Sequence, residues 1–285
     1  MSGDSRPVLE IASLSVGLGP GESAPLLSEI SLHAARLETV GVVGVSGCGK
    51  SVLASAVLGL LRTPPLEVQG SIRLNGGELV GKSEAELRRL RGSEVSLIVS
   101  NARSRLNPLI PVGEQLGRAI RAKRRVSKRE AAAEARELLE SVGIGDPDRR
   151  MRALPSELSG GMCQRIVIAM GICNQPSLII ADEPTSGLDV TIQTQVLTLI
   201  RELIGRVGAA MLLMTRDLGV VAHFCDRVVV LQKGRVVESA PVREFFYRPQ
   251  HDHSRLLLDA AFASRGESGA GGDGPPAATA AGAGA

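Results

Sequence analysis

Short runs of consecutive apolar residues alternate along the chain with segments in which apolar residues recur at helical spacing. The run at Glu38–Val43 predicts a strand, and a glycine-rich stretch separates it from a predicted helix with Leu53, Val57 and Leu60 on one face. Three further runs predict strands of the same kind, at Ser177–Ala181, Ala209–Met214 and Val228–Leu231. Strands that are apolar on both faces are typical of a parallel sheet covered by helices. The pattern therefore predicts an α/β fold with a parallel-sheet core.

Two turns and one long helical stretch interrupt this alternation. Asn75-Gly76 and Lys233-Gly234 each separate strand-like runs and predict hairpins. The chain from residue 83 to 158 has mostly helical spacing, which predicts a helical lobe inserted into the core. The predicted division is an antiparallel β subdomain with the first core strand and helix (1–82), the helical lobe together with the region around Ser100 and the strand expected before it at Ser96–Val99 (83–158), the rest of the core (159–240), a C-terminal extension (241–263) and a disordered tail rich in Gly, Ala and Pro (264–285).

A phosphate-binding loop is predicted between the first core strand and its helix. Residues 44–51 read GVSGCGKS and fit the pattern GxxxxGK[ST], in the strand–loop–helix context that the pattern requires. Backbone N–H groups of such a loop surround phosphate oxygens, the lysine reaches the terminal phosphates, and the serine hydroxyl ligates Mg²⁺. The alternative is a glycine-rich turn without a ligand. The predicted binding residues are Gly44, Ser46, Gly47, Cys48, Gly49, Lys50, Ser51 and Val52.

Cys48 within this loop has two interpretations. It can be a small side chain that fills space, or a thiol exposed in the site, whose pKa a helix N-terminus would lower.

Two carboxylates follow the apolar strand that ends at Ala181. Asp182 at the strand end can hold the Mg²⁺ shell together with Ser51, and Glu183 can polarise water against a terminal phosphate. A pair of solvated acids is the alternative, which the phosphate-binding loop makes less attractive. The predicted catalytic residues at this stage are Lys50 and Glu183, and the predicted metal ligands are Ser51 and Asp182.

A third motif precedes the acidic strand. Residues 158–165 read LSGGMCQR, and residues 186–189, after the acids, read SGLD. In this order the motifs resemble those of the ATP-binding-cassette (ABC) ATPases, and the resemblance covers roughly residues 8–262. It implies a P-loop NTPase fold of the ABC type with ATP and Mg²⁺ as cofactors. It also implies that Ser159, Gly160 and Gly161 start a helix that contacts the nucleotide of a second ATPase subunit.

The resemblance narrows to the ATPases of dipeptide, oligopeptide and nickel importers. Leu106-Asn107-Pro108, the segment ADEPTSGLDV and the stretch from Arg248 to Leu257 are similar to that branch. It implies a heterodimer of two cassettes at the cytoplasmic face of the membrane, two integral membrane permease subunits that dock near residues 101–112, and an extracellular solute-binding protein.

Two catalytic positions depart from the family pattern. Ser100 stands where the family places a glutamine, and serine reaches a metal only through a bridging water. Arg216 stands where the family places a histidine, and arginine accepts no hydrogen bond. Arg216 can act as an arginine finger, or it can turn to solvent or to an acid and leave the site crippled, which we expect. The resemblance thus predicts slow hydrolysis at this chain's own site, while its signature completes the partner's site.

The adenine-binding position also departs from the pattern. Leu18 lies near the place of the family's stacking aromatic residue, which predicts weaker adenine binding.

Composition and charge exclude several classes. Aromatic residues make up 2% of the chain, which argues against RRM and OB folds that stack bases on aromatic platforms. The net charge of +3 indicates no polyanion-binding protein, and we expect no nucleic-acid partner. The basic run at residues 121–129 is typical of a solvated face, with lipid headgroups as the alternative ligand.

Cysteine spacing and apolar runs bear on the compartment. The four cysteines form no CxxC pair, which favours a reducing compartment without disulfides or zinc. The N-terminus lacks a signal-peptide pattern, and no apolar run has the length of a membrane span. A soluble ABC ATPase outside transport, or a nucleotide-dependent clamp with little hydrolysis, remains the alternative to a transporter subunit.

Overall fold

The computed structural model describes residues 6–18, 25–61 and 66–266. Its six-stranded sheet has the order β10-β9-β3-β8-β7-β6. The strands are β3 (Thr39–Val43), β6 (Val95–Val99), β7 (Leu178–Asp182), β8 (Ala210–Thr215), β9 (Arg227–Gln232) and β10 (Arg235–Pro241). All neighbours are parallel except β9 and β10, which form a hairpin across the Lys233-Gly234 turn. The predicted α/β fold with a parallel core is confirmed.

A second, antiparallel sheet has the order β2-β1-β4-β5. Its strands are β1 (Leu9–Gly17), β2 (Leu27–Ala34), β4 (Glu67–Leu74) and β5 (Gly77–Glu78). The predicted Asn75-Gly76 turn joins β4 to β5. Apolar side chains from this sheet and from helix α1 (Lys50–Val57) form one buried cluster with the adjoining face of the six-stranded sheet.

The register of the parallel strands places four loops at one edge of the sheet. Val43 pairs with Thr215, Asp182 pairs with Met214, and Val99 pairs with Asp182. The residues that follow these strand ends are Gly44, Arg216, Glu183 and Ser100. The fold therefore gathers every loop that carries a predicted catalytic residue.

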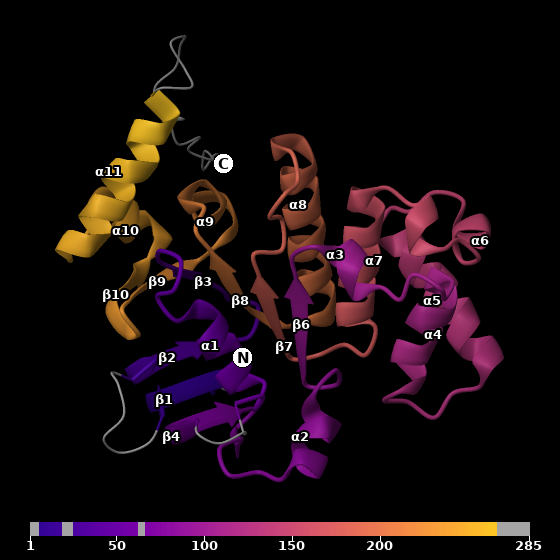
Figure 1. Cartoon of the computed structure of the whole chain (residues 1–285), viewed down its shortest axis with the longest axis horizontal. Helices are drawn as coiled ribbons and strands as arrows, with labels where there is room; N and C mark the ends of the chain where they lie inside the picture. The colour runs from indigo at the N-terminus through magenta and orange to yellow at the C-terminus, as the bar shows by residue number, and fades with distance from the viewer. Residues whose placement is uncertain (1–5, 19–24, 62–65, 267–285) are drawn as a thin grey trace, which may run out of the picture.

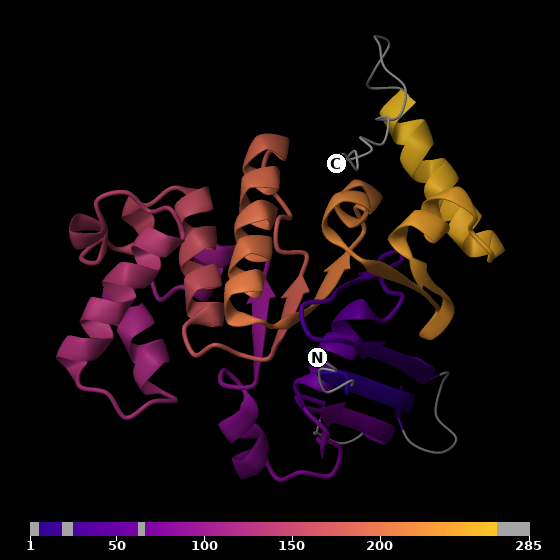
Figure 2. The same ribbon diagram turned by 180° about the vertical axis from the view of Figure 1, so that it is seen from behind.

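Helices surround this sheet and extend to one side of it. They are α2 (Glu84–Leu90), α3 (Ala102–Arg105), α4 (Val112–Arg121), α5 (Lys128–Ser141), α6 (Pro147–Arg150), a 3-10 turn (Pro155–Glu157), α7 (Gly160–Ile172), α8 (Val190–Val207), α9 (Leu218–Phe224), α10 (Val242–Tyr247) and α11 (Asp252–Gly266). In Figure 1, α4, α5 and α6 form a lobe at one end and α10 and α11 lie at the other. The view from behind shows the same separation (Figure 2).

Three sequence-based boundaries need correction. The interval 83–158 includes β6, at the place of the strand predicted before Ser100, and α2, which lies apart from α4–α6 in Figure 1, so the helical part of this interval that packs as a lobe begins at α3. Leu60 lies beyond the end of α1 and is 52% exposed, because the helix stops at Val57 before the predicted face is complete. Helix α11 continues to Gly266, and the remainder of the predicted disordered tail, 267–285, lies outside the described residues.

Candidate functional site

The loop between β3 and α1 has a backbone that only glycine permits at two points. Gly44 has φ +154°, and a Cβ there would lie 2.3 Å from the carbonyl oxygen of Leu231. Gly49 has φ +115°, and a Cβ there would lie 2.7 Å from Leu27 Cδ2. Glycine at both positions lets the chain turn tightly from strand to helix, and successive N–H groups of such a turn can surround an anion.

Lys50 lies at the start of α1 with its side chain folded under this loop. The residue is 8% exposed, and its Nζ donates hydrogen bonds to the carbonyl oxygens of Gly44, at 2.6 Å, and Val45, at 3.2 Å. No carboxylate of the described residues forms an ion pair with it. A buried ammonium held only by neutral groups is stabilised when an anion binds beside it. Lys50 therefore fits a phosphate group.

Cys48 is 3% exposed and belongs to the apolar cluster beneath the loop. Its Sγ lies 3.8 Å from Lys50 Nζ. These positions support the interpretation of Cys48 as a space-filling side chain and disagree with an exposed thiol.

Ser51 and Asp182 meet across the cavity floor. Ser51 Oγ donates a hydrogen bond to Asp182 Oδ2 at 3.0 Å, which joins the start of α1 to the end of β7. A hydroxyl and a carboxylate oxygen are the ligands that Mg²⁺ prefers, with waters and phosphate oxygens completing its shell. The pair therefore fits a magnesium ion between the loop and β7.

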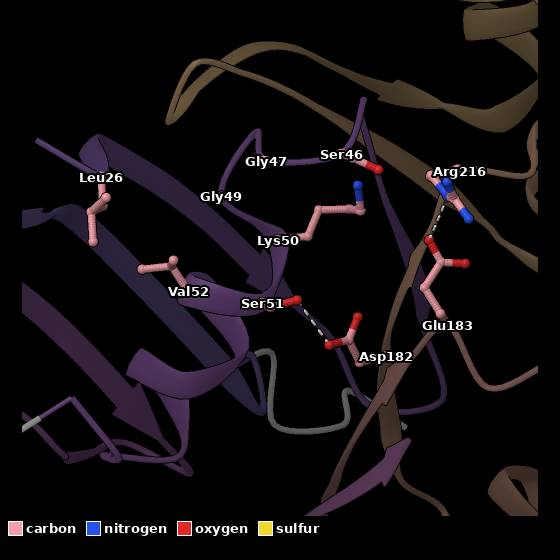
Figure 3. Close-up of a pocket in the computed structure, with 10 residues that line it drawn as sticks. All are labelled: Leu26, Ser46, Gly47, Gly49, Lys50, Ser51, Val52, Asp182, Glu183 and Arg216. Atoms are coloured by element: carbon pink, nitrogen blue, oxygen red, sulfur yellow. Dashed lines mark hydrogen bonds and ion pairs between the residues drawn. The ribbon is translucent and has the colours of Figure 1, made fainter. Parts of the chain in front are cut away.

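Glu183 follows Asp182 and has an unusual backbone. Its φ of 48° lies in the left-handed region, and its N–H donates to the Met214 carbonyl at 2.9 Å. Such backbone strain is concentrated at functional sites, where surrounding contacts hold it. The conformation directs the Glu183 side chain into the same cavity as Lys50 (Figure 3).

The cavity has a volume of about 380 Å³. It is lined by Leu26, Ser46, Gly47, Gly49, Lys50, Ser51, Val52, Asp182, Glu183 and Arg216. The structure thus brings together most of the predicted nucleotide-binding and metal-binding residues of the loop and of β7. Gly44 and Cys48 support the loop from beneath without lining the cavity.

Arg216 reaches this cavity from the end of β8. Its Nε lies 3.3 Å from Glu183 Oε1, and the two side chains are 60% and 27% exposed. Of the two expected directions for Arg216, solvent or an acid, the side chain takes the acid, which is the predicted catalytic carboxylate. An exposed pair of this kind contributes roughly 0.2–1 kcal/mol. The contact therefore occupies Glu183 without locking it.

Two residues at this edge lie away from the cavity lining. Ser100 donates its backbone N–H to the Asp182 carbonyl at 3.2 Å, and its side chain does not line the cavity. Leu18, near the predicted adenine-binding position, does not line the cavity either, whereas Leu26 does.

The predicted signature residues lie outside this cavity. Ser159 caps α7, with Met162 N–H donating to Ser159 Oγ at 3.2 Å. Ser159 and Gly160 are exposed, Gly161 is partly buried, and a Cβ at Gly160 would have nothing within 4 Å. A capped helix start with open N–H groups can accept a phosphate that comes from another molecule. The start of α7 is therefore open at the surface of the chain.

Sequence reasoning missed a contact between Arg103 and the signature. The Arg103 guanidinium donates a hydrogen bond to the carbonyl of Leu158, the residue before Ser159. The positions are 55 residues apart, and no sequence motif links them. Only the packing of α3 against α7 brings them together.

No helix between residues 6 and 266, within the described ranges, is long and apolar enough to cross a membrane. The same residues contain no group of three or more His, Cys, Asp or Glu side chains placed to hold a metal ion.

Comparisons with known proteins agree with this geometry. The sequence pattern of the ABC transporter family matches residues 27–186. A probable peptide ABC transporter ATP-binding protein of Sinorhizobium fredii is 44% identical over 82% of this chain and 70% of its own length. The oligopeptide transport ATP-binding protein OppD of Lactococcus lactis is 41% identical, over 90% of this chain and 76% of its own.

A solved structure supports the same family. An ATP-binding cassette, dimeric and bound to ADP and phosphate in a post-hydrolysis state, superposes with a TM-score of 0.71 and 25% identity, over 82% of this chain and 99% of its own. With the loop, the acidic strand end and the signature all in place, the chain belongs to the ABC transporter family, as one of its ATP-binding ATPases.

Proposed function

We propose that this chain is the ATPase subunit of a transporter that imports peptides or similar small solutes. The observation that carries the proposal is the cavity in which Lys50, Ser51, Asp182 and Glu183 converge, with the signature exposed elsewhere on the molecule. The names of relatives at 41–44% identity support peptides as the solute class.

The loop residues have distinct roles in binding ATP. Backbone N–H groups between Ser46 and Ser51 donate to phosphate oxygens, and Lys50 exchanges loop carbonyls for the β- and γ-phosphates. Ser51 Oγ and Asp182 would hold Mg²⁺, which neutralises phosphate charge when it is bound.

Hydrolysis at this site is slow in our proposal, for two reasons. Glu183 faces Arg216, so its carboxylate is shared with a cation instead of being directed only at water. Ser100 does not reach the cavity, so no side chain at that position orients the water. Loss of such positioning costs about 10²–10⁴-fold in rate.

A second ATPase subunit completes the proposed assembly. Ser159, Gly160 and Gly161 are free to cap a nucleotide held by that subunit, whose own signature would cap the site on this chain. We infer an asymmetric heterodimer with one slow and one competent site. It works at the cytoplasmic face of the membrane under two permease subunits and receives solute from an extracellular binding protein.

A nucleotide-dependent clamp is the second candidate function. The ion pair between Arg216 and Glu183 favours it, since a site that binds ATP and scarcely hydrolyses it would hold two subunits together. A soluble ABC ATPase outside transport is a third, and association with membrane proteins separates it from the first.

The test uses the complex purified from source membranes through a tag on this chain. We expect integral membrane proteins to co-purify and the reconstituted complex to hydrolyse ATP faster when peptide is transported. Glu183→Gln should leave most of that turnover, whereas the matching change in the second ATPase subunit should abolish it. Absence of membrane proteins would refute the transporter role, and loss of all turnover in Glu183→Gln would refute the asymmetry.

A further inference from the structure

Helix α3 lies directly after the Ser100 position and packs on the signature helix α7. Asn101 enters it with φ 56°, and Ser104 Oγ closes the turn by donating to the Asn101 carbonyl at 2.8 Å. Ala102 and Leu106 are buried in the same apolar cluster as Leu158. The short helix is therefore fixed against the base of α7 by packing on one face.

Arg103, on the same short helix, adds a polar contact to this packing. Its guanidinium donates to the carbonyl of Leu158. The carbonyl of Leu158 and the N–H of Ser159 belong to one planar peptide unit, so a bond that fixes the direction of one fixes the other. Leu158 itself is 3% exposed, and its backbone is extended at φ −116° and ψ 149°. Arg103 thus sets the orientation of the peptide that opens the signature.

The opposite end of the same segment faces outward. Leu109 is 84% exposed on the loop between α3 and α4. Buried Gln115 holds that loop by accepting from the Asn107 N–H at 2.8 Å and donating to the carbonyls of Asn107, at 2.9 Å, and Ile110, at 2.7 Å. The chain from Arg103 to Ile110 is therefore held at two points, by Gln115 near its exposed apolar tip and by Arg103 at the signature.

We propose that Arg103 is a positioning residue for the phosphate cradle formed by Ser159, Gly160 and Gly161. It acts through the Leu158–Ser159 peptide and not by touching the nucleotide. The proposal rests on the proposed function, because the cradle serves a nucleotide bound by a second subunit. Removing the Arg103 donor should slow ATP hydrolysis at the site on the second subunit, which this cradle completes. It should leave ATP binding to this chain's own loop unchanged.

The variants separate the hydrogen bond from general damage. Arg103→Met keeps an unbranched apolar stem and removes the donor, and Arg103→Lys retains one donor. Arg105→Met is the matched control, since Arg105 lies on the same four-residue helix, is exposed, and makes no hydrogen bond or ion pair recorded among the described residues.

In the purified complex, Arg103→Met should lower kcat for ATP by about tenfold to a hundredfold, the effect of a displacement of about 1 Å in a catalytic group. KM and the affinity of this chain for a fluorescent ATP analogue should stay unchanged. Arg103→Lys should recover part of kcat, and Arg105→Met should match the wild type. Equal kcat values for Arg103→Met and Arg105→Met, or a parallel loss of analogue affinity, would overturn the proposal.

Hydrogen exchange on the isolated chain distinguishes this failure from failure of the proposed function. Arg103→Met should exchange faster than Arg105→Met at the amides of residues 159–163. If the wild-type complex hydrolyses no ATP, the proposed function fails, and the exchange comparison alone decides whether Arg103 orders the signature. Identical exchange in the two variants would overturn the positioning role.

Discussion

Replacing Arg216 separates two ways in which this residue can slow hydrolysis. Its Nε lies 3.3 Å from Glu183 Oε1 and attracts the carboxylate away from water. It also lacks the lone pair through which a histidine accepts a hydrogen bond. The exposed ion pair is worth roughly 1 kcal/mol at most, which corresponds to about fivefold in rate. A missing acid–base or positioning group costs about 10²–10⁴-fold. The missing histidine should therefore matter more than the ion pair.

The assay makes this chain's site the only active one. The second subunit's catalytic carboxylate is changed to glutamine, and Ser100→Gln is present throughout so that the serine does not limit the rate. Release of radioactive γ-phosphate is then followed in a single turnover. Arg216→Ala should raise the rate by less than about fivefold, and Arg216→His by about a hundredfold or more. Equal increases would show that the ion pair itself is the brake, and no increase with histidine would refute the reasoning.

Three further predictions concern binding, reactivity and stability. Lys50→Met should weaken magnesium–ATP binding about a hundredfold in equilibrium dialysis, and an unchanged affinity would contradict the role of the buried ammonium. Burial, with Asp226 nearby, raises the pKa of the Cys225 thiol to about 12. The rate of its alkylation, followed by mass spectrometry, should therefore keep rising up to pH 10. A plateau in that rate near pH 9 would contradict the raised pKa. Burial acts to raise the pKa of Glu238, but donors of the C-terminal segment, including the backbone N–H groups of Gln250 and His251, lower it overall below 4.5. A lowered folded-state pKa stabilises the protein fully above the unfolded-state pKa, and this stabilisation is lost as the pH falls through the folded-state pKa. Glu238→Gln should therefore cost about 1–3 kcal/mol in chemical unfolding at pH 7. That difference should shrink as the pH falls below 4.5, and a difference independent of pH would be inconsistent with the linkage.

Local patterns in the sequence were sufficient to predict the strands of the core and most of the residues that line the cavity. Continuous apolar runs predicted the parallel strands, because burial on both faces leaves no room for polar positions. The phosphate-binding loop could be predicted because its backbone requires glycine at two positions, where other residues would be strained or too close to neighbouring atoms. Those glycines form part of the recognisable sequence pattern. Lys50, Ser51, Asp182 and Glu183 were then brought together by strand register alone.

Contacts between segments that are distant in the sequence could not be predicted from local patterns. The sequence indicated that Arg216 would face solvent or an acid, and only the register of β7 beside β8 identifies that acid as Glu183. The link from Arg103 to Leu158 depends on α3 packing against α7. The strand before Ser100 was predicted at Ser96–Val99, close to its observed bounds, but its place at the end of the six-stranded sheet follows only from its pairing with β7. Such features are determined by tertiary packing, which produces no periodic pattern of hydrophobic and polar residues in the sequence.

The most direct test of whether this chain binds a nucleotide at its own phosphate-binding loop is calorimetric titration. ATP is titrated into the purified complex with and without magnesium. The second subunit's loop lysine is changed to methionine, so that any remaining heat comes from this chain. We expect one saturable, magnesium-dependent binding event that disappears when Lys50→Met is added. Heat that is absent in the first complex, or that persists after Lys50→Met, would contradict nucleotide binding at this site.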